Sequence, residues 1–201
     1  MKEIAKETIL LEIKKYRRGI LFFTENFISK SNAKTVNKTL ERLAASGEIA
    51  RVALGIYTRP KKSRLFGFVL PGAEEVVRAI AKRDKARIVP TGYLALNKLG
   101  LSTQVPMKLV YLTDGAPRTV IIGKQTVTLK KTTPKNLIAK GEISGLVIQA
   151  LKTIGKNKVD EKTETIILEQ LKKEKTANII HDSKLAPVWI ATILKKAIVK
   201  E

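Results

Sequence analysis

The sequence contains no cysteine in its 201 residues. Disulfide bonds, thiolate metal ligands and a cysteine nucleophile are therefore excluded, and the fold must be held together by packing. Aromatic residues make up only 5% of the chain, which leaves few rings for stacking against unpaired bases. No apolar run reaches the roughly 18 residues that a membrane-spanning helix requires, so no membrane partner is expected.

Features of an active site are also missing. No glycine-rich turn leads from a strand into a helix, and acidic residues do not cluster at metal-ligand spacing. The single histidine, His181, stands beside Asp182, but adjacent residues point apart on a helix or strand. We therefore expect a surface or packing histidine. The sequence predicts a protein without enzymatic activity, catalytic residues, cofactor or metal.

Acidic residues are few beside basic ones: 18 Asp and Glu stand against 39 Lys and Arg, a formal net charge of +21. Such an excess predicts a polyanionic partner, with nucleic acid first and an anionic membrane surface second. Both halves of the chain are basic, so charge supports nucleic-acid binding only together with its placement. The glutamates among the first lysines do not resemble a secretory signal, so we expect a cytoplasmic protein.

The first 60 residues predict the element order of a winged helix-turn-helix. A helix, a short strand, two helices and a hairpin are expected at Lys2–Tyr16, Ile20–Phe22, Thr24–Phe27, Ser31 or Asn32 to Gly47, and Ile49–Leu54 with Ile56–Arg59. Thr24 is expected to cap the second helix, and Ser31 or Asn32 the third. Gly47 stands where a helix C-terminal cap favours glycine, and Gly55 turns the hairpin.

The third of these helices has two different faces. Val36, Leu40 and Leu43 fall on one flank at about 100° per residue, while Lys34, Lys38 and Arg42 fall nearly opposite. In a winged helix this element enters the major groove, and the hairpin follows the sugar-phosphate backbone. The predicted DNA contacts are Lys34, Thr35, Asn37, Lys38 and Arg42 of the helix, Arg51 and Arg59 of the wing, and Lys61 and Lys62 after it. A merely solvated helix and a protein-docking module remain the alternatives.

The second half predicts a separate α+β domain. Residues 61–72 read as a linker, which divides the chain into a DNA-binding domain at 1–70 and a C-terminal domain at 71–201. Within the second domain we expect helices at Ala73–Arg83 and Thr91–Leu99, extended runs at 109–112, 119–122 and 126–129, and helical spacing at 146–154, 166–171 and 187–199. The three extended runs are expected to form a small antiparallel sheet.

Two blocks of sequence resemble a known family. The first comprises Arg18–Phe22, Leu40-x-Arg42-Leu43, Gly47–Ile49 with Arg51, and Gly55–Tyr57; the second runs from Pro90-Thr91-Gly92 to Val105-Pro106 and continues at Tyr111–Gly115. Together they are similar to the AbiEi-type antitoxins, which are the transcriptional-regulator half of type IV toxin-antitoxin systems. The resemblance covers roughly residues 15 to 130.

This resemblance implies a transcriptional repressor that binds inverted repeats in its own promoter. It also implies an antitoxin that counteracts a nucleotidyltransferase-type toxin encoded next to it, without a stable complex between the two proteins. The alternative is a general nucleic-acid-binding protein for RNA or single-stranded DNA that has no toxin partner. That alternative would need aromatic stacking platforms, which the composition disfavours.

Overall fold

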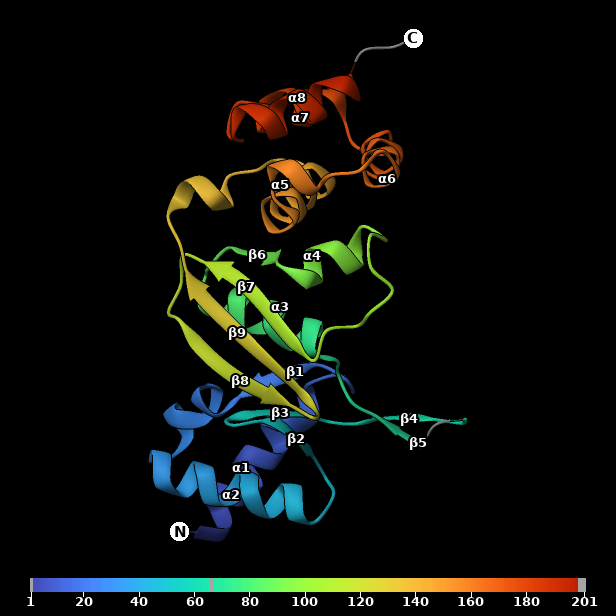
Figure 1. The fold of residues 1–201 in the computed structure, drawn as a ribbon. Helices are drawn as coiled ribbons and strands as arrows, with labels where there is room; N and C mark the ends of the chain where they lie inside the picture. Colours follow the sequence, from blue (N-terminus) through green and yellow to red (C-terminus); the bar gives the residue numbers. More distant parts are fainter. Residues whose placement is uncertain (1, 66, 199–201) are drawn as a thin grey trace. The chain divides into compact units, whose positions relative to one another are not determined.

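A computed structural model describes residues 2–65 and 67–198, and the fold is of the α+β class (Figure 1). The chain divides into two compact units. The first comprises residues 1–80 with 120–125, and the second comprises residues 81–119 with 126–201. The predicted domain boundary near residue 70 lies inside the first unit, about ten residues before that unit gives way to the second after residue 80. The two units are described separately below.

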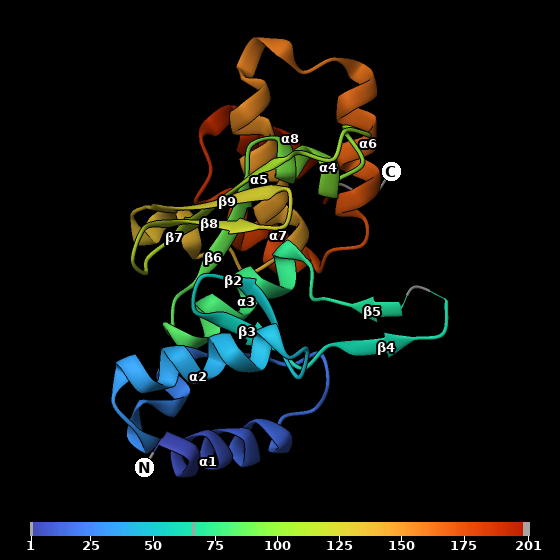
Figure 2. The same cartoon turned by 90° about the horizontal axis from the view of Figure 1, so that it is seen from below.

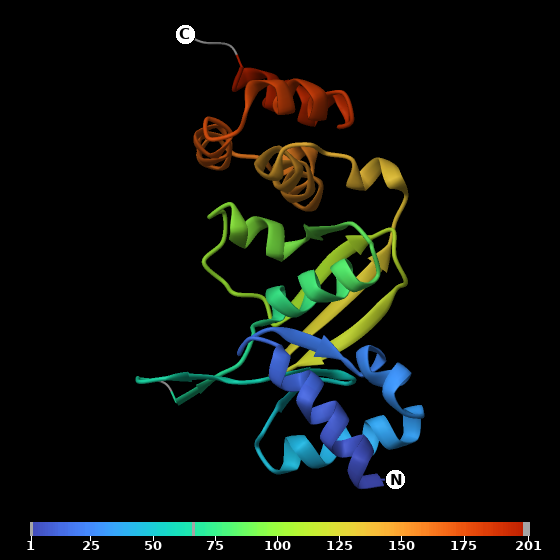
Figure 3. The same ribbon diagram turned by 180° about the vertical axis from the view of Figure 1, so that it is seen from behind.

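The first unit begins with a helix, a strand and two further helical segments. These are α1 (Lys2–Lys15), β1 (Leu21–Phe23), the 3-10 helix η1 (Thr24–Lys30) and α2 (Ala33–Ala45), followed by the strands β2 (Ala50–Ala53) and β3 (Ile56–Thr58). The three strands form an antiparallel sheet in the order β1-β3-β2. Figure 3 shows α1 and α2 side by side next to this sheet.

The core of this unit explains how α2 is oriented. Val36, Leu40 and Leu43 of α2 are fully buried among apolar residues of the other elements: Ile9, Ile13, Phe22, Phe27, Ile49 and Tyr57. The rings of Phe22 and Phe27 meet edge to face, with a centroid distance of 5.7 Å and an interplanar angle of 89°. Each large buried side chain contributes about 1.5–3 kcal/mol of burial energy, so the apolar flank of α2 cannot turn outward cheaply.

The cap at the beginning of α2 is the predicted one, whereas the cap of η1 differs from the prediction. The Asn32 side chain accepts a hydrogen bond of 2.9 Å from the backbone N–H of Thr35, as predicted for an N-terminal cap. Thr24, in contrast, is the first residue of η1 and not its cap. The Asn26 side chain accepts the bond there, from the backbone N–H of Phe23 at 2.7 Å. Asn26, which lies inside η1, therefore takes the place that the sequence had assigned to Thr24.

The segment predicted as a linker is largely ordered as a hairpin. Strands β4 (Lys61–Ser63) and β5 (Gly67–Val69) pair antiparallel, with Lys62 opposite Phe68 (Figure 2). The glycine, proline and charge content that indicated a linker instead belongs to a ribbon whose strands have no buried face. Helix α3 (Ala73–Arg83) follows at the predicted bounds.

Most of a four-stranded sheet belongs to the second unit. Its order is β6-β7-β9-β8, and its strands are β6 (Ile88–Thr91), β7 (Lys108–Thr113), β8 (Arg118–Ile122) and β9 (Gln125–Lys131). The prediction of an antiparallel sheet was wrong in one respect. Strand β9 lies between β7 and β8 and runs parallel to β7, so the sheet is mixed (Figure 1). Strand β6 was not expected: Thr91 belongs to it, and α4 (Tyr93–Lys98) begins only after Gly92.

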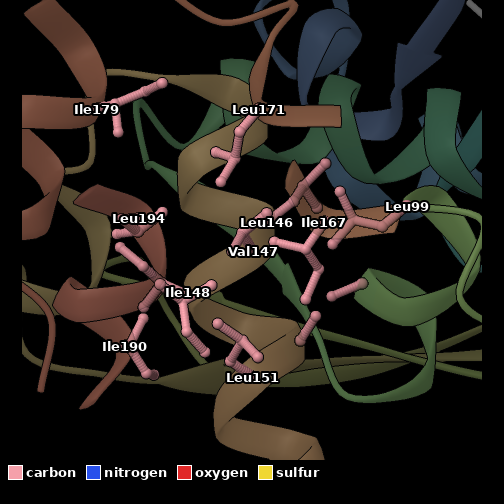
Figure 4. Packing of buried hydrophobic residues seen from close by; sticks show 13 residues of the cluster. Leu99, Leu146, Val147, Ile148, Leu151, Ile167, Leu171, Ile179, Ile190 and Leu194 are labelled. Atoms are coloured by element: carbon pink, nitrogen blue, oxygen red, sulfur yellow. The ribbon is translucent and has the colours of Figure 1, made fainter. Parts of the chain in front are cut away.

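Helices complete the second unit: η2 (Pro134–Leu137), α5 (Glu142–Ile154), η3 (Lys156–Lys158), α6 (Glu161–Leu171), α7 (Thr176–Ser183) and α8 (Val188–Lys196). The apolar side chains of α5 are surrounded by Leu99, Ile167, Ile179, Ile190 and Leu194 from the neighbouring elements (Figure 4). Helix α7 was not predicted. The last predicted helix ends at Lys196, and Val199 lies outside the described residues. None of the helices in the described part of the chain is long and apolar enough to cross a membrane.

Candidate nucleic-acid interface

Helix α2 presents a polar face on the side away from its core contacts. Lys34, Asn37, Lys38 and Arg42 are all exposed, while Thr35 is half-buried beside the cap. The three basic side chains are spaced four residues apart, so they lie in a row along one face of the helix. Their ammonium and guanidinium groups can reach phosphate oxygens, and the Asn37 amide and Arg42 guanidinium can pair with base edges.

The β2–β3 hairpin adds a basic residue close to one end of this face. Arg51 of β2 is exposed and stands opposite Tyr57 of β3. Burial raises the pKa of the Tyr57 hydroxyl, the positive charge of Arg51 lowers it, and the negative charge of Glu41 raises it again. The charges of Arg51 and Glu41 therefore both act on the Tyr57 hydroxyl. Glu41 of α2 gives the face one acidic residue, which would repel a phosphate backbone and favours a cytosine amine or a neighbouring cation.

Arg59 has a different environment from the one predicted for a wing residue. Its Nη1 donates hydrogen bonds to the backbone carbonyls of Lys14, at 2.8 Å, and Tyr16, at 2.9 Å. Carbonyls at the end of a helix lack partners within the helix, and a cation there also complements the helix dipole. Arg59 thus ties the end of α1 to the end of β3, and contact with DNA would compete with these bonds.

The basic residues after the β2–β3 hairpin differ in whether their side chains pack against other parts of the chain. The aliphatic stem of Lys61 lies against Gly19, which has φ +86° and leaves no room there for a Cβ. Lys62 and Arg64 of the hairpin are exposed. The structure therefore brings Lys34, Thr35, Asn37, Lys38 and Arg42 together on α2, with Arg51 nearby, and places Arg59 directly after β3 and Lys61 and Lys62 on β4.

The histidine and its neighbour do not point apart, and this prediction was wrong. His181 Nδ1 lies 2.8 Å from Asp182 Oδ1, because the side chain of the fully buried Asp182 turns back toward its neighbour. Asp182 also accepts bonds from Ser144 Oγ, at 2.5 Å, and from the backbone N–H groups of Lys140 and Gly141. Serine and histidine both bond to the carboxylate and not to each other, so the histidine does not activate the serine as in a hydrolase triad.

The carboxylates of this cluster instead accept hydrogen bonds from the backbone N–H groups at the start of α5. Glu174 accepts from the backbone N–H of Ile143 at 3.0 Å and from Asn178 Nδ2 at 2.9 Å, beside the bonds to Asp182. Burial acts to raise the pKa of both carboxyl groups, but the hydrogen bonds they accept outweigh it and lower both pKa values. The two side chains come from 31 to 42 residues away, so no local capping pattern indicates them. Among residues 2–65 and 67–198 no group of acidic and histidine side chains could hold a metal ion.

A family assignment covers most of both units. The residues matched are 8–179, in a family of unknown function. The chain belongs to DUF6088. No curated protein matches it. Membership in DUF6088 carries no statement of activity or partner, so the antitoxin role and the DNA contacts stay predictions.

Proposed function

We propose that the protein is a sequence-specific, double-stranded DNA-binding transcriptional regulator, and that its first unit is a winged helix-turn-helix. The observation that carries this proposal is the exposed basic face of α2, held outward by three fully buried residues on its other side. The succession of α1, β1, η1, α2, β2 and β3, with the sheet order β1-β3-β2, supports the same assignment.

In this proposal α2 lies in the major groove. Asn37 reads an adenine and Arg42 a guanine through paired hydrogen bonds, while Lys34 and Lys38 contact phosphates. Thr35 stands at the beginning of the helix, where its hydroxyl can meet a phosphate, while its backbone N–H bonds to Asn32. Arg51, Lys61 and Lys62 extend the contact along the backbone, and Arg59 supports the wing through its bonds to α1.

The proposed biological role is that of a repressor that binds inverted repeats in its own promoter and counteracts a nucleotidyltransferase-type toxin without forming a stable complex. This role rests on the similarity to AbiEi-type antitoxins. It requires no catalytic group, cofactor or metal in this chain. The alternative, binding of RNA or single-stranded DNA without a toxin partner, is less well supported, because Phe22, Phe27 and Tyr57 are buried, which leaves few exposed rings, such as Phe68, for stacking.

A comparison of two charge-deleted variants tests the proposal. Affinity for the duplex upstream of the gene is measured by fluorescence anisotropy against a scrambled duplex, across a salt series. Lys38→Ala with Arg42→Ala should weaken specific binding by tens-fold or more, at about 1–3 kcal/mol for the base contact plus the phosphate loss. Lys158→Ala with Lys184→Ala removes the same charge from exposed sites on the second unit and should have a much smaller effect.

Two results would contradict the proposal. Equal affinities for both duplexes that fall together as salt rises would mean that the net charge alone binds DNA. An unchanged affinity in a folded Lys38→Ala, Arg42→Ala protein would remove α2 from the interface. The antitoxin role is tested separately, by growth of cells that co-express the neighbouring gene with this one. Rescue by wild-type protein supports the role, and no rescue contradicts it.

A further inference from the structure

The first unit contains a cleft that shares Lys62 with the proposed DNA contacts but whose other lining residues those contacts do not explain. It has a volume of ≈590 Å³ and lies between α1, the turn after α2 and the β4–β5 hairpin. Small-molecule sites in proteins commonly have volumes of about 300–1,000 Å³. This cleft is therefore large enough for a ligand the size of a nucleotide.

The charge of the cleft is predominantly positive. Lys14, Arg18, Arg59 and Lys62 line it, and among the described residues Glu48 is the only carboxylate in the lining. Lys14, Arg18 and Lys62 are exposed, and their side chains extend from three different segments. Several cations converging on one concave space match a ligand with several negative charges, because phosphate oxygens accept charge-assisted hydrogen bonds from each of them.

The cleft also has an apolar part. Phe68 of β5 lines it with 65% of its surface exposed, directly opposite Lys62 in the hairpin. The partly exposed Leu10 contributes aliphatic surface at the same place, whereas Ile13 and Pro60, which also line the cleft, are buried. An exposed ring is costly in water, and its face offers a platform on which a planar base can stack. Inorganic phosphate would leave this surface unused, whereas a nucleotide would cover both parts.

We propose that this cleft binds a free nucleoside polyphosphate, with its phosphates on Lys14, Arg18 and Lys62 and its base on Phe68. Gly47 and Glu48, which line the cleft, directly follow α2, and the backbone N–H of Glu48 bonds to Leu43 of that helix. A bound nucleotide therefore contacts the segment that ends α2 and changes the affinity of the protein for its duplex. The binding stands on the cleft alone, but its effect on DNA rests on the proposed function.

Isothermal titration of the full-length protein with ATP, without DNA, tests the binding. Lys14→Ala and Phe68→Ala should each weaken ATP binding by about tenfold, the loss typical of one charged hydrogen bond or one stacked base. Two matched variants should bind as wild type does. Lys15→Ala removes the adjacent lysine of α1, and Leu65→Ala removes an exposed apolar residue of the same hairpin, and neither residue lines the cleft.

A gain of affinity provides a further check. Glu48→Gln removes the one carboxylate from the lining and should tighten ATP binding by about twofold to fivefold. Pyrophosphate should bind more weakly than ATP, and its binding should not depend on Phe68. Absence of ATP binding, or equal losses in the cleft variants and their matched controls, would overturn the proposal. Because DNA is absent from this titration, a failure of the DNA-binding proposal leaves its result unaffected.

The coupling is then measured by repeating the duplex anisotropy titration with and without ATP. Wild type should show a change of about threefold or more in duplex affinity, and Lys14→Ala should not. If ATP binds in the cleft and duplex affinity stays the same in both proteins, the regulatory part of the proposal is overturned and the binding part is retained.

Discussion

At the scale of single residues, Asp182 has the most demanding environment in the chain. Its side chain is fully buried and accepts hydrogen bonds from Lys140, Gly141, Ser144 and His181. A carboxylate can accept at both oxygens, whereas an asparagine has one oxygen and turns an NH₂ group toward the remaining donors. The arrangement therefore requires a carboxylate and not simply a polar side chain.

Asp182→Asn should lower the free energy of unfolding by about 2–4 kcal/mol, because buried backbone donors lose their acceptor. The measurement is urea denaturation at neutral pH. Asp160→Asn is the matched control: Asp160 caps α6 through the N–H of Thr163 at an exposed site, where asparagine caps equally well. A loss of similar size in both variants would contradict the role assigned to Asp182.

The lowered pKa of Asp182 predicts how the free energy of unfolding depends on pH. Because the pKa of Asp182 is lowered in the folded state, its contribution to stability is present above the ordinary aspartate pKa of about 3.9. That contribution is lost as the pH falls from this range through the lower folded-state pKa. Wild type should therefore lose stability on acidification, and Asp182→Asn should show a flatter profile. Parallel profiles for the two proteins would contradict the lowered pKa.

At the scale of elements, two arginines at the β2–β3 hairpin should affect different properties: one the stability of the fold and the other the binding of DNA. Arg59 bonds to carbonyls at the end of α1, whereas Arg51 is exposed on β2. Arg59→Ala should cost about 1.5–3 kcal/mol of unfolding free energy and leave the salt dependence of DNA binding nearly unchanged. Arg51→Ala should leave stability within about 0.5 kcal/mol and reduce the salt slope by about one unit. Urea denaturation and the anisotropy salt series measure both, and the reverse pattern would exchange the two roles.

Elements with one strong local pattern could be predicted from the sequence. Helix α3 has apolar residues at helical spacing with acidic residues first and basic residues last, and it was predicted at its observed bounds. The exposed face of α2 followed from the same periodicity. The β4–β5 hairpin could not be predicted, because its strands have no buried face and therefore no alternating pattern. The insertion of β9 between β7 and β8 could not be predicted either, because strand composition does not determine strand order.

The residues of the candidate site also fall into those that the sequence could place and those that it could not. Lys34, Lys38 and Arg42 could be assigned to one face because they belong to a single helix. The bond from Arg59 to Lys14 joins residues 45 positions apart, and the bond from Gly141 to Asp182 joins residues 41 positions apart. Contacts at such separations depend on the folded topology, so the sequence alone indicated an arginine that contacts DNA and a histidine that points away from Asp182.

At the scale of the whole molecule, the net charge of +21 affects folding and DNA binding in opposite directions. Repulsion among the excess cations destabilises the compact state, and added salt screens it. Most of the described ion pairs, such as Lys15–Glu12 and Lys172–Glu169, are exposed and contribute little that salt could weaken. Salt should therefore stabilise the folded protein while it weakens binding to DNA.

The melting temperature, followed by circular dichroism at neutral pH, should rise between about 20 mM and about 300 mM NaCl, over which range the screening length falls severalfold. Over the same range the affinity for any duplex should fall. A melting temperature that decreases with salt would mean that favourable ion pairs outweigh the repulsion, and the excess charge would then be balanced within the fold. A rise in melting temperature with a fall in affinity would instead show that the cations remain unneutralised until a polyanion binds, which is the condition that the proposed function requires.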